Sequence, residues 1–318
     1  DGKRVRVNAG RIKPLATTLV DLFDAPTRGP LRMSRQDAPR LSEALGQDKW
    51  AIEGESLLHA WLVKIRKAQT IEPVAAPDGL LLTLRAYQRA GLAWLQHLRK
   101  NELGGILADD MGLGKTAQTL AHLLLEKQAG RLDRPVLIVL PTSLIFNWAN
   151  EVQRFAPALR VLKLQGKARS EAFAQIPNHD LCLTTYPLLW RDREQLAAHS
   201  YHYVILDEAQ TVKNAASQAA KVVRELDARH RLCITGTPLE NHLGELWAQF
   251  DFLLPGFLGD AKDFNTRWRN PVEKQGNLLR REVLSRRIAP FILRRRKEDV
   301  AKELPPKTIV VRSVSLEG

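Results

Sequence analysis

The segment Asp109-Asp-Met-Gly-Leu-Gly-Lys-Thr116 limits the possible folds of this chain more than any other stretch. It follows a short apolar run, Gly105–Ala108, and leads into a helix-like run at 116–127. A strand, a glycine-rich turn, a Lys-Thr pair and a helix form a layout that cradles phosphates. We therefore expect the following residues to hold a nucleotide: Asp110, Met111, Gly112, Leu113, Gly114, Lys115 and Thr116.

Two of these side chains have the right chemistry for ATP with Mg²⁺. The Lys115 ammonium can reach the β- and γ-phosphates, and the Thr116 hydroxyl can bind Mg²⁺. The general form of this motif has a glycine where this chain has Asp109. A chance glycine turn before a helix is the alternative interpretation.

A second motif, Tyr203-Val-Ile-Leu-Asp-Glu-Ala-Gln210, ends an apolar strand with two adjacent carboxylates. Asp207 is suited to the Mg²⁺ shell, and Glu208 to orienting and deprotonating the attacking water. A strand that ends in Asp-Glu is common, so the prediction depends on its pairing with the phosphate loop. Lys115, Asp207 and Glu208 are then the predicted catalytic residues.

Two further segments belong with this site. Gln88 precedes the phosphate loop by one helix, and its amide can read the edge of adenine; an exposed helical Gln is the alternative. A strand expected at 231–235 ends in Thr235, Gly236 and Thr237, which we expect at the nucleotide edge as coupling residues. The two threonine hydroxyls can bond Asp207 or water at the γ-phosphate. The alternative is that the segment forms a plain Thr-Gly turn.

Apolar runs and helix-like runs alternate after residue 79, which predicts an α/β fold with a parallel sheet covered by helices on both faces. The expected strands are 105–108, 136–140, 160–164, 180–183, 203–206 and 231–235, and the expected helices include 116–127, 144–155, 215–226 and 243–253. We divide the chain into a small, mainly helical N-terminal segment with a linker (1–78), an ATP-binding lobe (79–254) and a helical insertion with a following block (255–318).

Charge gives an independent indication of a partner. The formal net charge is +13, and basic residues recur from Arg280 to Lys297. Such a balance favours nucleic acid, while a solvated basic helix face is the alternative. No apolar run reaches the ~20 residues that span a bilayer, so no membrane partner is expected. We also expect Cys182 and Cys233 to be buried thiols, and the chain to be an internal piece of an intracellular protein.

Together these motifs resemble the first RecA-like motor lobe of superfamily-two helicases, and specifically the Swi/Snf family of DNA-dependent ATPases. The resemblance runs from Leu84 to Lys307 and includes, besides the motifs above, Pro141–Trp148, Thr184–Tyr186, Thr235–Asn241 and Pro290–Lys297. Gln210 departs from the family, in which His is commoner at this position.

The resemblance implies a P-loop motor that uses ATP and Mg²⁺ to move along double-stranded DNA, of the type that remodels chromatin or other nucleoprotein. Its DNA-binding candidates are Thr142, Thr184 and Thr185, at the carboxyl edge of the sheet, where hydroxyls can hold phosphates without reading bases. The family's second lobe supplies arginines to the γ-phosphate, so we expect this fragment alone to be nearly inactive.

Further expectations concern the protein's setting. They are a monomer that acts on a DNA-bound protein complex, located in the cytoplasm at a bacterial nucleoid, or in the nucleus of a eukaryote. Two other functions stay open, namely an RNA helicase lobe of the DEAD/DEAH type and a non-catalytic scaffold with a degenerate site.

Overall fold

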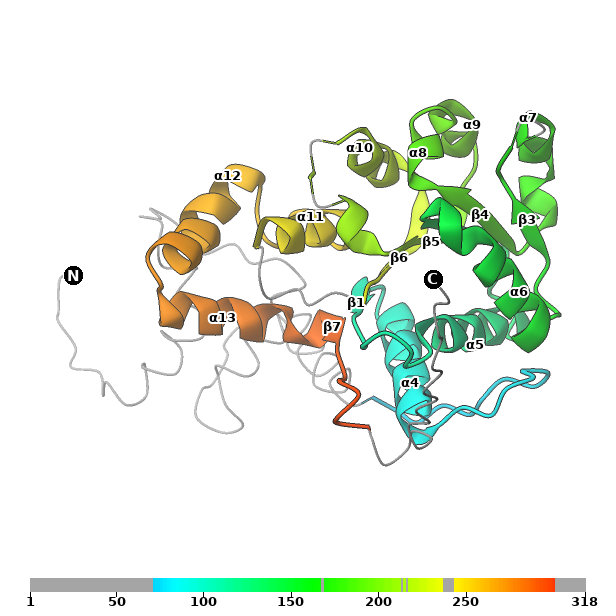
Figure 1. Cartoon of the computed structure of the whole chain (residues 1–318), viewed down its shortest axis with the longest axis horizontal. Coiled ribbons are helices and arrows are strands. Elements are labelled where there is room, and N and C mark those ends of the chain that lie inside the picture. Colours follow the sequence, from blue (N-terminus) through cyan, green and yellow to red (C-terminus); the bar gives the residue numbers. More distant parts are fainter. Residues whose placement is uncertain (1–70, 167–168, 213, 216, 237–242, 301–318) are drawn as a thin grey trace, which may run out of the picture.

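A single parallel sheet forms the centre of the computed structural model, which describes residues 71–166, 169–212, 214–215, 217–236 and 243–300. Within these residues the strand order is β3-β4-β2-β5-β6-β1-β7, and every neighbouring pair is parallel (Figure 1). The strands are β1 (Gly105–Leu107), β2 (Val136–Leu140), β3 (Val161–Lys163), β4 (Leu181–Thr185), β5 (Tyr201–Asp207), β6 (Ala228–Ile234) and β7 (Ile292–Leu293). The predicted parallel sheet is confirmed.

Helices cover both faces of this sheet. One face packs against α4 (Ala86–Lys100), α5 (Lys115–Gln128) and α6 (Ile145–Phe155). The other face packs against α8 (Tyr186–Leu189), α9 (Arg193–Ala197), α10 (Gln218–Glu225) and α11 (Leu243–Leu253). Successive strand residues point to opposite faces, so Ile138 lies in one apolar cluster and Val139 in the other. This explains why the central strands are apolar throughout instead of alternating.

Short elements complete the described part of the chain. They are the helices α7 (Arg169–Ala172), α12 (Ala261–Phe264) and α13 (Leu278–Ile288), a π-helical segment (Asn265–Lys274), and the 3₁₀ turns Thr142–Leu144, Phe173–Asn178, Ala209–Val212 and Ala289–Phe291. β2 and α11 match the ranges expected from the sequence, and the other predicted strands and helices deviate from theirs by a few residues.

The C-terminal part differs from the prediction in one respect. The helical insertion lies between β6 and β7, whereas we expected it after the last strand. β7 returns to the sheet beside β1, with Ile106 paired to Ile292 and Leu107 to Leu293. The block expected at 255–318 therefore contributes a strand to the same sheet. Most of the predicted segment 1–78 lies outside the described residues.

Two simpler expectations can be checked directly. Cys182 and Cys233 are buried free thiols, and burial raises the pKa of Cys182 to about 12. No helix among the described residues is long and apolar enough to cross a membrane.

Candidate nucleotide site at the carboxyl edge of the sheet

The phosphate loop joins β1 to α5. Gly112 and Gly114 have φ angles of 85° and 76°, in the left-handed region that glycine adopts without strain. A Cβ at Gly114 would also collide with the amide nitrogen of Gln88. These two constraints explain why this turn requires glycine.

Lys115 is the first residue of α5, and its ammonium turns back over the loop. Nζ donates to the carbonyl oxygens of Asp109 at 2.7 Å and Asp110 at 3.3 Å. Burial lowers the pKa of Lys115, while nearby carboxylates, including Glu208 and Asp207, oppose that shift. The Lys115 ammonium therefore lies within the electrostatic influence of both carboxylates of the second motif, as the sequence predicted.

Asp207 ends β5 and is buried, with 7% of its surface exposed. Its Oδ2 accepts a 2.7 Å hydrogen bond from the indole Nε1 of Trp148, and its Oδ1 accepts the backbone N–H of Glu208 at 2.9 Å. The Tyr186 hydroxyl donates to the Asp207 carbonyl oxygen at 2.7 Å. Burial raises the pKa of Asp207, and the bond from Trp148 counters this effect. Two hydrogen bonds thus fix the orientation of this carboxylate, and a third holds the backbone of the same residue.

Glu208 has a φ of 50°, which is unusual for a residue with a side chain. Non-glycine residues in this region concentrate at functional sites, where surrounding contacts hold them. Here Gln210 Nε2 donates to Glu208 Oε2 at 2.5 Å, and Thr235 Oγ1 donates to Gln210 Oε1 at 2.9 Å. Gln210 therefore bridges Glu208 to the end of β6, and Thr235 directs its hydroxyl hydrogen at this bridge.

Gly236 lies beside the phosphate loop. A Cβ at this position would be 2.9 Å from Met111 Cγ and 3.6 Å from Lys115 Nζ. The end of β6 therefore approaches the Lys115 ammonium closely, as its predicted place at the nucleotide edge requires. Thr237, the third predicted coupling residue, lies outside the described residues.

Gln88 is buried beneath the same loop. Its Oε1 accepts the backbone N–H of Arg85 at 2.9 Å, and its Nε2 donates to the Leu113 carbonyl oxygen at 3.3 Å. The amide is thus in contact with the phosphate loop. Adenine recognition by this residue stays a prediction.

The groups at this edge fit ATP and Mg²⁺. The loop offers backbone donors, two left-handed glycines and a lysine ammonium, which match the oxygens of a triphosphate. Thr116 and Asp207 are oxygen ligands of the kind that Mg²⁺ prefers. A bound Mg²⁺ would neutralise charge on the phosphates.

The predicted DNA-binding residues do not share one environment. Thr142 is exposed in the turn after β2. Thr184 and Thr185 are 0% and 3% exposed. Since buried hydroxyls cannot reach the backbone of DNA, we correct the prediction of phosphate contacts by these two side chains. They lie at the end of β4, directly before α8.

The basic run near the C-terminal end is divided as well. Arg286 pairs with Glu282 at 2.6 Å. Arg287 is buried and donates to the Phe257 carbonyl oxygen at 2.5 Å. Arg295 pairs with Asp109. Part of this run is therefore structural.

Sequence reasoning did not find the roles of Trp148, Tyr186 and Arg295. All three occur in segments that we assigned to motifs, but nothing in those motifs indicated that Trp148 and Tyr186 bond Asp207. Their signal was the presence of a polar atom on an otherwise apolar helix face, since a buried indole or phenol usually has a hydrogen-bond partner.

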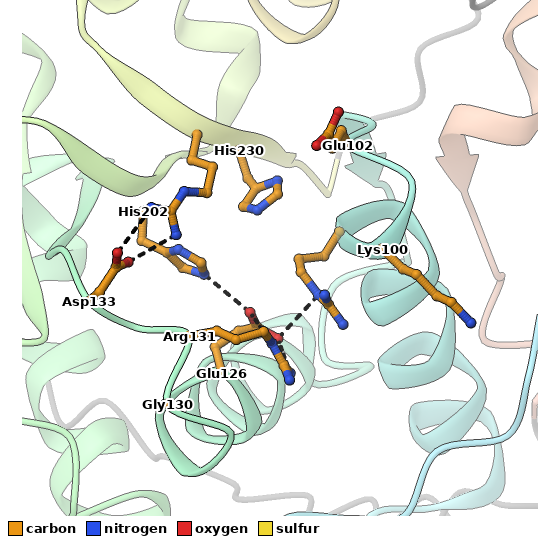
Figure 2. Close-up of a pocket in the computed structure, with 10 residues that line it drawn as sticks. Lys100, Glu102, Glu126, Gly130, Arg131, Asp133, His202 and His230 are labelled. Carbon is orange, nitrogen blue, oxygen red and sulfur yellow. Dashed lines mark hydrogen bonds and ion pairs between the residues drawn. The ribbon is translucent and has the colours of Figure 1, made fainter.

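A separate cavity of about 510 Å³ lies at the opposite, amino edge of the sheet. Figure 2 shows His202 and Arg131 directed at Glu126, a fully buried carboxylate. His202 Nε2 lies 3.2 Å from Glu126 Oε2, and Arg131 and Arg99 also pair with this carboxylate. Because these partners compensate the buried charge, we interpret the cluster as a structural polar network.

The described geometry can be set against known proteins. Residues 87–318 match the SNF2-related domain family. The chain belongs to that family. This agrees with the resemblance drawn from the motifs.

Relatives come from yeast and bacteria. The chain is 39% identical over 262 residues to the TATA-binding protein-associated factor MOT1 of Saccharomyces cerevisiae. This alignment covers 75% of this chain and 14% of MOT1. It is 40% identical over 255 residues to the putative ATP-dependent helicase/translocase YwqA of Bacillus subtilis. This alignment covers 79% of this chain and 28% of YwqA. The chain thus spans less than a third of the length of either relative.

A solved structure supports the fold assignment. The Sulfolobus solfataricus SWI2/SNF2 ATPase core in complex with double-stranded DNA aligns with a TM-score of 0.68 and 38% identity. The alignment covers 72% of this chain and 48% of that core. The RecA-like lobe of an SNF2-type ATPase is therefore the fold of this chain.

Proposed function

We propose that this chain binds and hydrolyses ATP as the first motor lobe of a double-stranded DNA translocase. One observation carries the proposal. The Lys115 ammonium lies at the phosphate loop under the influence of Asp207 and Glu208, at the carboxyl edge where parallel sheets bind ligands. Family membership supports ATP as the nucleotide.

The roles of the site residues follow from their chemistry. Lys115 and the loop N–H groups bind the phosphates, and Thr116 and Asp207 would hold Mg²⁺. Glu208, which Gln210 holds in place, takes the proton of the attacking water. Gln88 contacts the base from its place beneath the loop.

Double-stranded DNA is the proposed track. The net charge of +13 and the exposed Thr142 at the carboxyl edge favour contacts to phosphates without base reading. The similar Sulfolobus core forms a complex with double-stranded DNA, and MOT1 is, by its name, a factor associated with the TATA-binding protein. A DNA-bound protein complex is accordingly the proposed substrate of the whole protein.

Full activity needs groups outside this chain, in our proposal. The alignment covers 48% of the similar ATPase core, and the resemblance places further phosphate-contacting arginines in the family's second lobe. An arginine added to a phosphoryl-transfer site is worth about a thousandfold to a hundred-thousandfold in rate. We therefore propose that the 318-residue chain alone is nearly inactive.

The deciding experiment compares the ATPase rate of the full-length protein with no nucleic acid, with duplex DNA and with structured RNA. Stimulation by duplex DNA supports the translocase, whereas stimulation by RNA alone would favour the DEAD/DEAH-type alternative. An absence of turnover with every nucleic acid would favour the non-catalytic scaffold.

A further inference from the structure

The chain after β7 continues to follow the phosphate loop. Leu293 O accepts the backbone N–H of Ala108 at 2.8 Å, and Arg295 O accepts that of Asp110 at 3.0 Å. Lys297 donates its own N–H to the Asp110 carboxylate at 3.0 Å. Pairing that begins between β1 and β7 therefore extends into the residues that start the loop.

Arg295 reinforces this pairing with its side chain. Its Nε donates to Asp109 Oδ1 at 2.9 Å, its Nη2 pairs with Asp109 Oδ2, and Nη2 lies 2.7 Å from Gln118 Oε1. Gln118 Nε2 in turn donates to Asp109 Oδ2 at 3.2 Å and to the carbonyl oxygens of Leu113 and Gly114 at 3.4 and 3.3 Å. One buried cluster thus holds both ends of the loop.

The same guanidinium also reaches the helix before the loop. Nη1 donates to the Tyr87 carbonyl oxygen, and the guanidinium carbon lies 5.2 Å from the centre of the Tyr87 ring. Tyr87 adjoins Gln88, whose amide contacts the loop. Arg295 therefore joins three segments that surround the nucleotide site.

Close packing fixes the position of this cluster. A Cβ at Gly91, in the middle of α4, would lie 2.9 Å from Arg295 Nη2 and would collide with Gln118 Oε1. The absence of a side chain at Gly91 thus lets α4 approach the ion pair directly. This leaves the guanidinium little room to shift independently of its neighbours.

Asp109 has two roles that connect Arg295 to the catalytic lysine. Its carboxylate, which is fully buried, binds Arg295, while its carbonyl oxygen accepts the Lys115 ammonium at 2.7 Å. A buried ion pair is costly to desolvate, and an apolar pair could hold the sheet together equally well. A guanidinium, however, fixes direction through several hydrogen bonds at once.

We propose that Arg295 is a positioning residue for the phosphate loop, which makes the orientation of Lys115 depend on the segment that follows β7. This positioning role of Arg295 explains why the chain has a carboxylate at Asp109, where the general motif has glycine. The inference rests on the proposed function only in that the loop binds ATP.

The test uses the full-length protein with three changes. Arg295→Met removes the guanidinium and its hydrogen bonds. Asp109→Asn with Arg295→Met also removes the partner charge, so no buried carboxylate is left uncompensated. Arg295→Lys keeps the charge but cannot reach all the acceptors. Arg296→Met, an equivalent change at the exposed neighbouring arginine, is the matched control.

Two measurements distinguish positioning from general stability. We expect the double variant to melt near the wild-type temperature and yet to have a KM for ATP about tenfold higher than the wild type. Arg295→Lys should have a KM between those of the double variant and the wild type. In the wild type, ADP should slow hydrogen exchange at the backbone amides of Asp110, Arg295 and Lys297 together. The double variant should lose this response at Arg295 and Lys297, and Arg296→Met should keep it.

The inference is overturned if the folded double variant keeps the wild-type KM and the shared exchange response to ADP. The ion pair would then be structural only. A wild-type protein that binds ADP but does not hydrolyse ATP would contradict the proposed function instead, and the exchange experiment would still decide the role of Arg295.

Discussion

The indole Nε1 of Trp148 donates a 2.7 Å hydrogen bond to Oδ2 of Asp207 and so ties α6 to the carboxyl end of β5. α6 begins three residues after Thr142, the exposed candidate for DNA contact. The carboxylate proposed to hold Mg²⁺ is thus bonded to the helix that follows a proposed DNA-binding turn. A hydrogen bond therefore connects the proposed Mg²⁺ ligand to the helix next to the proposed DNA-binding turn.

Trp148→Phe tests that contact. Phenylalanine fills most of the space but donates no hydrogen bond, and a bond to a charged acceptor is worth about 1.5–3 kcal/mol. We expect the DNA-stimulated ATPase rate to fall roughly tenfold or more and the Mg²⁺ requirement to rise. Trp94→Phe is the matched control, because Trp94 Nε1 bonds the Pro290 carbonyl oxygen at 3.4 Å, away from both carboxylates. Equal losses in both variants would mean that only packing is affected.

Glu208→Gln and Lys115→Ala should separate hydrolysis from binding. The glutamine amide cannot accept the proton of water, so Glu208→Gln should bind ATP normally and lose nearly all turnover. Lys115→Ala removes the ammonium and should weaken binding as well. Titration with a fluorescent ATP analogue, alongside phosphate release, measures both effects. The general-base assignment would be wrong if Glu208→Gln kept most of its rate.

Thr142→Val should weaken binding to duplex DNA several-fold, because an exposed hydroxyl is lost at a phosphate-facing turn. Thr184→Val is the control: its hydroxyl is buried and has no hydrogen-bond partner among the described residues, so duplex affinity should not change. For the wild type, log K should fall linearly with log salt, by about 0.9 for each phosphate neutralised. Fluorescence anisotropy over a salt series checks both expectations, and identical affinities for the two variants would argue against Thr142 as a contact.

Acid should destabilise the fold through His122 and His230, two histidines that interact electrostatically with the buried Glu126. The pKa of His122 is lowered to about 3, chiefly by burial, and that of His230 to about 4 for the same main reason. An unfolded histidine has its ordinary pKa of 6.5, so the unfolded chain binds more protons as pH falls from 6.5 towards 4. Their contribution to stability is therefore complete above pH 6.5 and is lost below it, at up to about 1.4 kcal/mol per pH unit for each histidine.

Urea unfolding between pH 4 and pH 7.5 measures this dependence. His230→Asn should reduce the slope of the unfolding free energy against pH by an amount close to the uptake of one proton, because only one shifted group is removed. A slope unchanged in His230→Asn would exclude this histidine as a source of the acid sensitivity.

Local patterns were sufficient to predict how the residues of the proposed nucleotide site are arranged. The glycines at 112 and 114 have the positive φ angles that a tight turn before a helix requires, and the apolar run before Asp207 forms a buried strand. Because parallel strands end at a common edge, these two motifs had to meet once the sheet formed. Their juxtaposition with Lys115 was therefore predictable from the sequence.

The order of β7 in the sheet could not be predicted in this way. Ile292 and Leu293 form a two-residue strand whose partner, β1, lies far back in the sequence. So short an apolar run fits a strand, a turn or a helix end equally well. The partner, and with it the contact between Arg295 and Asp109, depends on where the intervening helices allow the chain to return.

The sequence by itself determined the chemistry at the carboxyl edge: a phosphate loop, two carboxylates and a sheet to align them, because turn geometry and strand burial depend on neighbouring residues. Only the tertiary structure decided which polar groups support that chemistry. The bond from Trp148 to Asp207 and the Arg295 ion pair join segments that are distant in sequence. Such contacts arise from packing between layers, which no local pattern encodes.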